Sequence, residues 1–345
     1  RLDEDPVALT YNSFAERIVS EHGMRIGIDP DFAMLSEAGA LDLMTQIVEA
    51  WPTDLDETLS PTGVVGKILP LAGEIGEHGY TVETAREALE EFGRELEQVG
   101  RGNDVARNVI DANRRRLAFL GPIEAYQQRK RDMGVLDFSD QLVLATRIVR
   151  EAPSVRAALR DEFRAVLLDE FQDTSVAQIR LLSALFAGSG VTAVGDPNQA
   201  IYGWRGASAG ALDTFHERFN PDGAAGSPVL PLSTAWRNDR AILRAANVVS
   251  SPLRRREARP GDPEAVRIPV EELRERPGAG PQEGRVVGAF VQDPLQEART
   301  IAAFMEERWG PDAQMAVLCR TRAQIAPIAE ALEERGVPYE VIGLG

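Results

Sequence analysis

AVLLDEFQDT, at Ala165–Thr174, is the stretch that decides the fold of this chain. Its apolar run ends abruptly in two acids, Asp169 and Glu170, a pattern typical of a buried parallel strand with carboxylates at its carboxyl end. A second apolar run leads into VGDPNQAIYGWRGA at Val194–Ala207, and a predicted helix at 175–186 separates the two. The sequence therefore predicts a strand–helix–strand crossover with parallel strands, whose carboxyl ends are where such sheets bind ligands.

The two acids suit nucleotide hydrolysis. Mg²⁺ takes oxygen ligands, often one carboxylate plus phosphate oxygens, and Asp169 is placed for that role. Glu170 is placed to orient the attacking water as general base, and Gln199 to sense the terminal phosphate. Two solvated acids after a strand are common, so Asp-Glu alone does not establish this chemistry. Its combination with GDPNQ-x-IY-x-WRGA at 195–207 is far more specific.

DEFQDT and GDPNQAIYGWRGA resemble motifs II and III of the UvrD/Rep-type superfamily 1 DNA helicases, which are P-loop NTPases, and RecB/AddA-type nuclease-helicases share the pattern. The resemblance implies that Asp169 binds Mg²⁺, that Glu170 is the catalytic base and that Gln199 couples the γ-phosphate to DNA. Aromatic side chains stack on any base without reading sequence. The resemblance accordingly implies single-stranded DNA contacts from one loop: Tyr202, Trp204 and Arg205.

TYNSFA at Thr10–Ala15 resembles the family motif T-F/Y-H-S/A-F/L, which touches the DNA backbone. The resemblance implies DNA contacts from Thr10 and Asn12, although Asn12 stands where the family usually has His. An Asn side chain still donates and accepts hydrogen bonds. The alternative is an N-capped helix that starts at Ser13, and the sequence leaves both interpretations open.

Two later segments also resemble family motifs. STAWRN at Ser233–Asn238 resembles motif IV, N-Y/W-R-S, which implies a γ-phosphate contact from Arg237, because guanidinium matches phosphate oxygens bidentately. LDFSDQL at Leu136–Leu142 resembles the LDFDDLL segment that precedes motif II. Its acids, Asp137 and Asp140, are placed either to support the metal site or to cap the following helix, and capping is the preferred interpretation.

The order of patterns predicts an α/β protein: a RecA-like parallel-sheet core with an inserted helical subdomain, followed by the start of a second RecA-like domain. The helical insertion holds two basic clusters, 114–116 and 129–131, interpreted as solvated helix faces with phosphate contact as the alternative. Beyond the linker, strands are predicted at 286–291, 315–319 and 339–342, and helices at 294–309 and 323–335. The predicted domains are 1–15 (part of RecA-like domain 1A), 16–135 (helical, 1B-like insertion), 136–251 (remainder of 1A with motifs II, III and IV), 252–285 (linker or extended loop) and 286–345 (start of domain 2A).

The composition describes an ordinary soluble globular protein, with 345 residues, 43% hydrophobic and 27% charged. The net charge of −16 argues against a generally basic nucleic-acid binder but leaves room for a local basic groove. No apolar run reaches the length of a transmembrane helix. The one cysteine, Cys319, excludes a disulfide framework or a zinc site, and a cytoplasmic location without membrane contact is predicted.

The sequence contains no G-x-x-x-x-G-K-S/T, the loop that holds phosphates in P-loop enzymes. The chain is therefore interpreted as the central fragment of a helicase, inactive by itself. For the parent, the resemblance implies an ATP-dependent 3′–5′ DNA helicase or translocase in DNA repair or recombination. ATP and Mg²⁺ would be its cofactors and single-stranded or 3′-tailed duplex DNA its substrates; the sequence leaves its protein partners open. The alternatives are a RecB/AddA-type nuclease-helicase subunit, a non-catalytic DNA-binding module without a P-loop, and a small-molecule NTPase.

Overall fold

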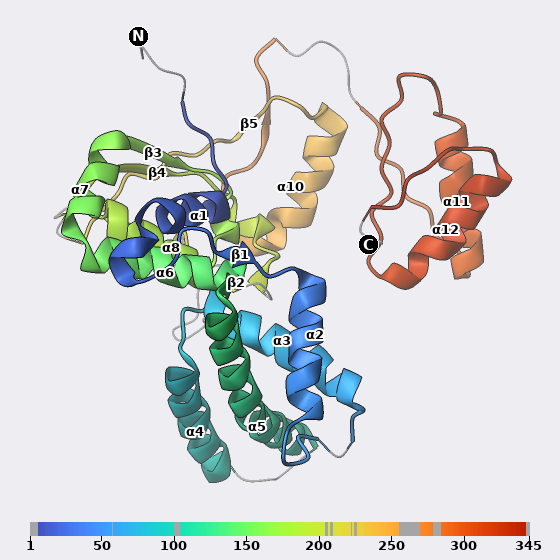
Figure 1. Cartoon of the computed structure of the whole chain (residues 1–345). Helices are drawn as coiled ribbons and strands as arrows, with labels where there is room; N and C mark the ends of the chain where they lie inside the picture. Colours follow the sequence, from blue (N-terminus) through green and yellow to red (C-terminus); the bar gives the residue numbers. More distant parts are fainter. Residues whose placement is uncertain are drawn as a thin grey trace. The chain divides into compact units, whose positions relative to one another are not determined.

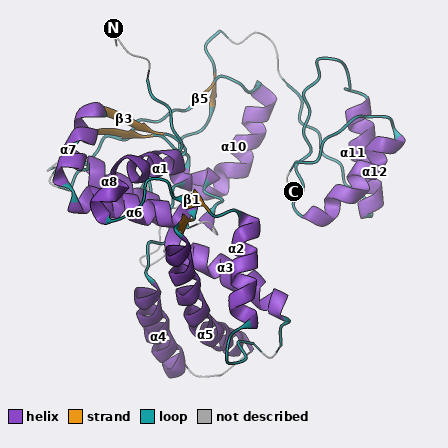
Figure 2. Ribbon diagram, viewed as in Figure 1, coloured by secondary structure: helices purple, strands orange, loops and turns teal. Residues whose placement is uncertain are grey.

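The computed structural model describes residues 6–56, 58–99, 104–203, 206–207, 210–221, 223, 226–254, 270–278 and 284–342 (Figures 1 and 2). Contacts divide the chain into two compact units, which are described separately: Arg1–Ser233 with Ser250–Glu272, and Thr234–Val249 with Leu273–Gly345.

The strands that carry the two acidic motifs form a parallel pair in the first unit. Strand β3 (Ala165–Leu168) runs beside β4 (Gly190–Ala193), and helix α8 (Val176–Phe186) connects them (Figure 1). The hydrogen bonding continues past the strands, since the Val194 N–H donates to the Leu168 carbonyl at 2.8 Å and the Phe171 N–H to the Val194 carbonyl at 2.9 Å. This confirms the predicted parallel crossover, and it places the acids of one strand beside the loop of the other.

The predicted burial of β3 is wrong for most of the strand. Leu168 is 4% exposed, whereas Leu167 is 79% exposed. Side chains alternate between the two faces of the pair, and the helical core covers the face that carries Val166 and Leu168, so the face that carries Leu167 lies open to solvent.

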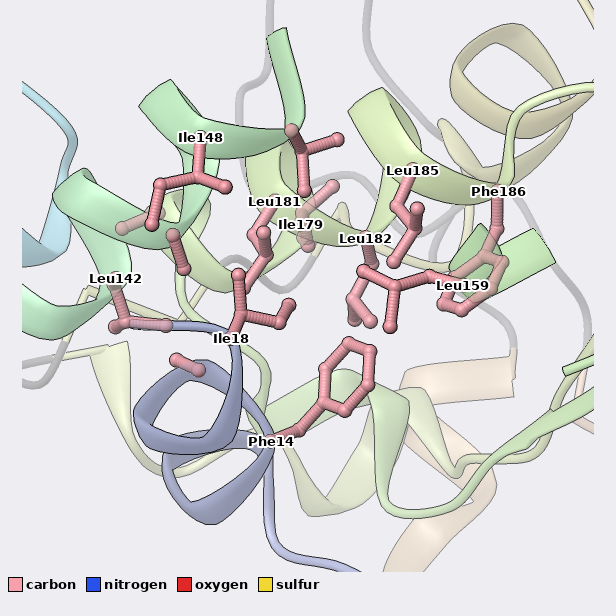
Figure 3. Packing of buried hydrophobic residues seen from close by; sticks show 14 of the residues in the cluster. Phe14, Ile18, Leu142, Ile148, Leu159, Ile179, Leu181, Leu182, Leu185 and Phe186 are labelled. Atoms are coloured by element: carbon pink, nitrogen blue, oxygen red, sulfur yellow. The ribbon is translucent and has the colours of Figure 1, made fainter. Parts of the chain in front are cut away.

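Four helices close the opposite side of this pair around an apolar core (Figure 3). Phe14 and Ile18 recur at helical spacing on one helix and meet apolar residues of the others, among them Leu142 and Phe186. The predicted boundary between residues 15 and 16 therefore falls inside the first helix, whose two halves pack in the same core. The helices are α1 (Tyr11–His22), α6 (Phe138–Glu151), α7 (Pro153–Glu162) and α8.

A second apolar core lies among the helices that follow α1, where a helical region was predicted. Met44, Ile68 and Leu120 are fully buried there, one from each of three helices. At the junction with the first core, strand β1 (Ala33–Met34) pairs in parallel with β2 (Val135–Leu136). The helices of this region are α2 (Glu37–Glu49), α3 (Pro61–Glu77), α4 (Val82–Val99) and α5 (Asp104–Met133).

Lys130, in the second predicted basic cluster, is buried rather than solvated, at 4% exposed. Its ammonium donates to Asp137 and, at 2.6 Å, to Asp140, and lies 4.8 Å from the centre of the Tyr126 ring. Lys130 thus links the end of α5 to the start of α6, where the two carboxylates form the capping box of α6. Capping by both acids is thus confirmed, whereas a solvated face is wrong for Lys130 because two partly buried carboxylates hold its charge.

The second unit contains α11 (Pro294–Glu306) and α12 (Ile325–Glu334), both predicted, around a small core that includes Ala302 and Leu332. The three strands predicted there are not found among its described residues. Phe290 and Leu318 are fully exposed, and the segments that carry them do not pair with another described strand. Strand β5 (Thr234–Ala235) pairs with β6 (Arg274–Glu275), which groups residues 234–249 with this unit and not with the preceding domain as predicted.

The remaining elements are α9 (Phe215–Phe219), α10 (Arg240–Arg254) across the boundary between the units, and the short 3₁₀ turns Gly23–Ile26, Phe171–Asp173, Pro197–Gln199 and Arg322–Gln324. Within the described part of the chain, every helix is too short or too polar to span a membrane.

Candidate functional site

Three segments gather at the carboxyl ends of β3 and β4. The Tyr11 hydroxyl, at the start of α1, donates to the carbonyl of Asp169 at 2.8 Å. Ser175 and Ala207 form an antiparallel bridge between the loop after β3 and the loop after β4. The structure thus brings the two acidic motifs and the amino-terminal motif to one edge of the pair, where ligands of open α/β sheets bind.

Asp169 and Glu170 both expose their side chains to solvent at this edge. The Glu170 N–H donates to Oδ1 of Asp169 at 3.0 Å. Glu170 has a φ of 49°, and among the described residues it is the one non-glycine with a positive φ. An L-residue in this left-handed region costs about 1–2 kcal/mol and occurs most often where a side chain must be aimed for function. The exposed Asp169 carboxylate fits a Mg²⁺ ion that takes one carboxylate plus phosphate oxygens.

Gln172 joins the two motifs, and sequence reasoning did not single it out. Its side chain is buried, with Nε2 donating to Oε2 of Glu170 at 2.7 Å and Oε1 accepting the Asp196 N–H at 3.0 Å. A weak signal was present in the sequence: an amide side chain lies beside two acids, and the Gly-Asp turn after the next strand needs an acceptor for its N–H.

Gln199 belongs to the same hydrogen-bonded chain. Its Nε2 donates to Oδ2 of Asp196 at 2.8 Å, while Oδ1 of Asp196 accepts the Asn198 N–H at 2.9 Å and so caps the turn that carries Gln199. Glu170, Gln172, Asp196 and Gln199 are therefore linked in series. The structure brings together the predicted base and the predicted phosphate sensor through two residues between them.

Negative charge concentrates at this edge and alters the ionisation of its neighbours. The pKa of Asp173 is raised, first by burial and then by the charge of Glu170, with a hydrogen bond from Gln172 acting in the opposite direction. The pKa of Tyr11 is raised, first by burial and further by Asp169 and Glu170, against a hydrogen bond with Thr174. A divalent cation at this edge would relieve the same charge.

The structure describes only some of the predicted DNA-contact residues. The loop after β4 is held by the Val176 N–H, which donates to the Gly206 carbonyl at 3.2 Å, and by the Ala207 N–H, which donates to the backbone carbonyl of the half-buried Tyr202 at 3.3 Å. Trp204 and Arg205 lie outside the described residues. The loop is fastened to the amino terminus of α8, next to the acids.

The amino-terminal motif is a capped helix start, although the cap differs from the one predicted. Thr10, not a residue after it, caps α1: its Oγ1 accepts the Ser13 N–H at 3.1 Å, and the helix begins at Tyr11. Asn12 accepts a hydrogen bond from Gln178 of α8 at 3.3 Å. DNA contacts from Thr10 and Asn12 stay predictions. Arg237 is exposed and belongs to the second unit, and its contact with the γ-phosphate also stays a prediction.

Gly206→Ala is expected to destabilise the first unit more than Gly188→Ala. Both glycines have a positive φ, +75° and +77°, so each alanine meets the same backbone strain. Only the Cβ at Gly206 meets a close neighbour, Cβ of Glu77 at 2.9 Å, which costs about 1–3 kcal/mol more. Urea denaturation of the two variants measures the difference, and equal midpoints would show that the loop does not pack on the end of α3.

Comparison with known proteins identifies the family. Residues 3–220, more than half of the chain, match the UvrD/REP helicase N-terminal domain. The chain belongs to the UvrD/REP helicase family. Membership implies a RecA-like α/β fold, with which the parallel β3–α8–β4 arrangement agrees.

The individual relatives that the chain resembles are named as DNA helicases. The chain is 25% identical over 339 residues to DNA helicase II of Escherichia coli, covering 97% of this chain and 40% of the relative. It is 24% identical over 339 residues to ATP-dependent DNA helicase PcrA of Leuconostoc citreum, covering 97% and 39%. It is 32% identical over 232 residues to ATP-dependent DNA helicase UvrD2 of Mycobacterium tuberculosis, covering 66% and 30%. The chain thus spans two fifths or less of the length of these relatives.

Proposed function

We propose that this chain is part of an ATP-dependent DNA helicase that moves 3′ to 5′ along single-stranded DNA, in DNA repair or recombination. The observation that carries the proposal is the hydrogen-bonded series from Glu170 through Gln172 and Asp196 to Gln199, in a chain that matches the helicase family over residues 3–220. Such a series connects the residue that would act on the attacking water with the loop that would meet both phosphate and DNA.

The residues divide the chemistry among them. Asp169 would hold Mg²⁺, which when bound neutralises charge on the phosphate oxygens. Glu170, exposed beside it, orients the attacking water and accepts its proton. Gln199 and Arg237 contact the γ-phosphate through an amide and a guanidinium, respectively.

DNA would bind along the loop after β4. Tyr202 and Trp204 offer stacking surfaces, Arg205 a positive charge, and Thr10 and Asn12 contacts to the phosphate backbone. Stacking on the bases suits single-stranded DNA and the single-stranded end of a 3′-tailed duplex, because neither has to be melted before the bases can be reached.

We further propose that helices α2–α5 are an insertion into a RecA-like domain built on β3 and β4, and that the second unit begins another RecA-like domain. Support comes from the two separate apolar cores of the first unit, joined by the β1–β2 pair at the point where the chain leaves and returns.

The experiment that tests the function is ATP hydrolysis with and without single-stranded DNA. Because no P-loop sequence occurs in these 345 residues, the assay compares this chain with a longer form that carries a P-loop upstream. We expect DNA-stimulated hydrolysis from the longer form and none from the 345 residues alone. A longer form that binds neither ATP nor DNA would refute the proposal.

Trp204→Ala is expected to weaken single-stranded DNA binding by about 1–3 kcal/mol, the value of one base–aromatic stack. The measurement is fluorescence anisotropy with a labelled oligothymidine at fixed salt, since affinity for DNA depends steeply on ionic strength. Trp309→Ala, which removes a half-exposed tryptophan of the second unit, is the matched control and should bind as the parent does. Equal affinity of the two variants for DNA would show that Trp204 does not contact the bound strand.

A further inference from the structure

Gln172 is a buried amide whose two ends are both used. It is 1% exposed, and burial of an amide costs free energy unless its donors and its acceptor find partners. Nε2 has two carboxylates within reach, Oε2 of Glu170 at 2.7 Å and Oδ2 of Asp173 at 3.3 Å, and Oε1 accepts the Asp196 N–H at 3.0 Å. The side chain thus spans the gap between the loops after β3 and β4.

The orientation of this amide is fixed by its partners. A carboxylate only accepts hydrogen bonds and a backbone N–H only donates, so the reversed amide would set Oε1 against two carboxylates and Nε2 against an N–H. The link between Glu170 and Asp196 therefore has one arrangement, and a shift of either loop must strain or break it.

Gly195 leaves just enough room for the link. A Cβ at Gly195 would lie 2.5 Å from Oε1 of Gln172, closer than any atoms pack without displacement. Gly195 does not have a positive φ, so its role here is the space it leaves and not an unusual backbone conformation. The glycine directly before Asp196 is thus a condition for the hydrogen bond that the Asp196 N–H makes.

We propose that Gln172 is a positioning residue that holds the Glu170 carboxylate and couples it to the loop at 195–199, so that DNA bound to that loop changes the rate of hydrolysis. This inference rests on the proposed function. Asp196 also holds Gln199. A displacement of the loop therefore reaches Glu170 through the Gln172 side chain, which is hydrogen-bonded to Asp196 and to Glu170. Coupling of this kind typically changes an equilibrium by about 5- to 150-fold.

The test uses the full-length protein that carries this chain together with a P-loop. Gln172→Leu removes the hydrogen bonds to Glu170, Asp173 and Asp196 at similar volume. We expect kcat with single-stranded DNA to fall by about tenfold or more, and the ratio of DNA-stimulated to basal kcat to fall with it, whereas KM for ATP changes little. Gly195→Ala displaces the amide from outside and should lower the same ratio, so it decides the matter if Gln172→Leu does not fold.

Gln141→Leu is the matched control, because Gln141 is equally buried, at 1% exposed, and its Nε2 contacts Met34 instead of a carboxylate. Its ratio should equal that of the unmodified protein. If Gln172→Leu and Gly195→Ala both keep full DNA stimulation, the coupling role is overturned while the proposed function stands. If the unmodified protein shows no hydrolysis that depends on Glu170, the proposed function fails and the coupling role fails with it.

Discussion

Glu170→Gln, in the protein that carries a P-loop, is expected to reduce ATP hydrolysis by about 10²- to 10⁴-fold, the usual contribution of a general base. The substitution keeps the shape of the side chain but removes the charge that accepts a proton from water. A neutral amide oxygen can still accept the hydrogen bond from Gln172, so the loop geometry should survive. The loss should therefore appear in kcat, with ATP affinity retained.

Two measurements separate catalysis from binding in this variant: single-turnover hydrolysis and equilibrium binding of a fluorescent ATP analogue. Glu16→Gln, at an exposed glutamate of α1, is the matched control and should hydrolyse ATP normally. Persistent hydrolysis in Glu170→Gln would assign the base to another residue.

Lys130→Met is expected to lower the free energy of unfolding by about 3–5 kcal/mol, the typical cost of leaving a buried charge without its partner. Methionine fills a similar volume, so the loss comes from two carboxylates that face each other at the start of α6. Ionised carboxylates only accept hydrogen bonds, so neither can bond to the other, and Lys130 is the cation that contacts both. Denaturant unfolding measures the loss. Lys67→Met, at an exposed lysine of α3, is the control and should change little.

The loss in Lys130→Met should shrink as the pH falls. The pKa of Asp140 is raised, first by burial and then by Asp137, while Lys130 acts in the opposite direction. Removal of Lys130 therefore raises this pKa further. A carboxyl group whose pKa is higher in the folded state binds more protons in that state. Stability therefore falls as the pH rises from the ordinary pKa of the group to its pKa in the folded protein, and it recovers on acidification. A loss that is independent of pH between 7 and the ordinary carboxyl range would contradict this account.

The sequence predicts features that depend on neighbours along the chain. Asp169 and Glu170 follow an apolar run, and Asp137 begins a helix with a second acid three positions on, so both placements were predictable. Features that depend on residues distant in the sequence were not predictable. The Asp196 N–H that Gln172 binds lies in the loop after the next strand, and the burial of Lys130 requires α5 to end against α6.

Strands illustrate the same limit. An apolar run such as 286–291 has the composition of a strand, but a strand forms only where another segment supplies hydrogen-bond partners. The exposure of Leu167 has a similar origin, because composition cannot tell which face of a sheet distant helices will cover. The roles of Trp204, which lies outside the described residues, and of the exposed Arg237 rest on motif resemblance.

The left-handed backbone of Glu170 has a consequence for how this protein changes under selection. Glycine adopts that conformation at no steric cost, and asparagine does so more easily than glutamate. Under the proposed role of Glu170 as the base, directed evolution for heat resistance alone would enrich replacements at position 170 that abolish hydrolysis. A library screened for survival on heating should for that reason carry a second screen for ATP turnover.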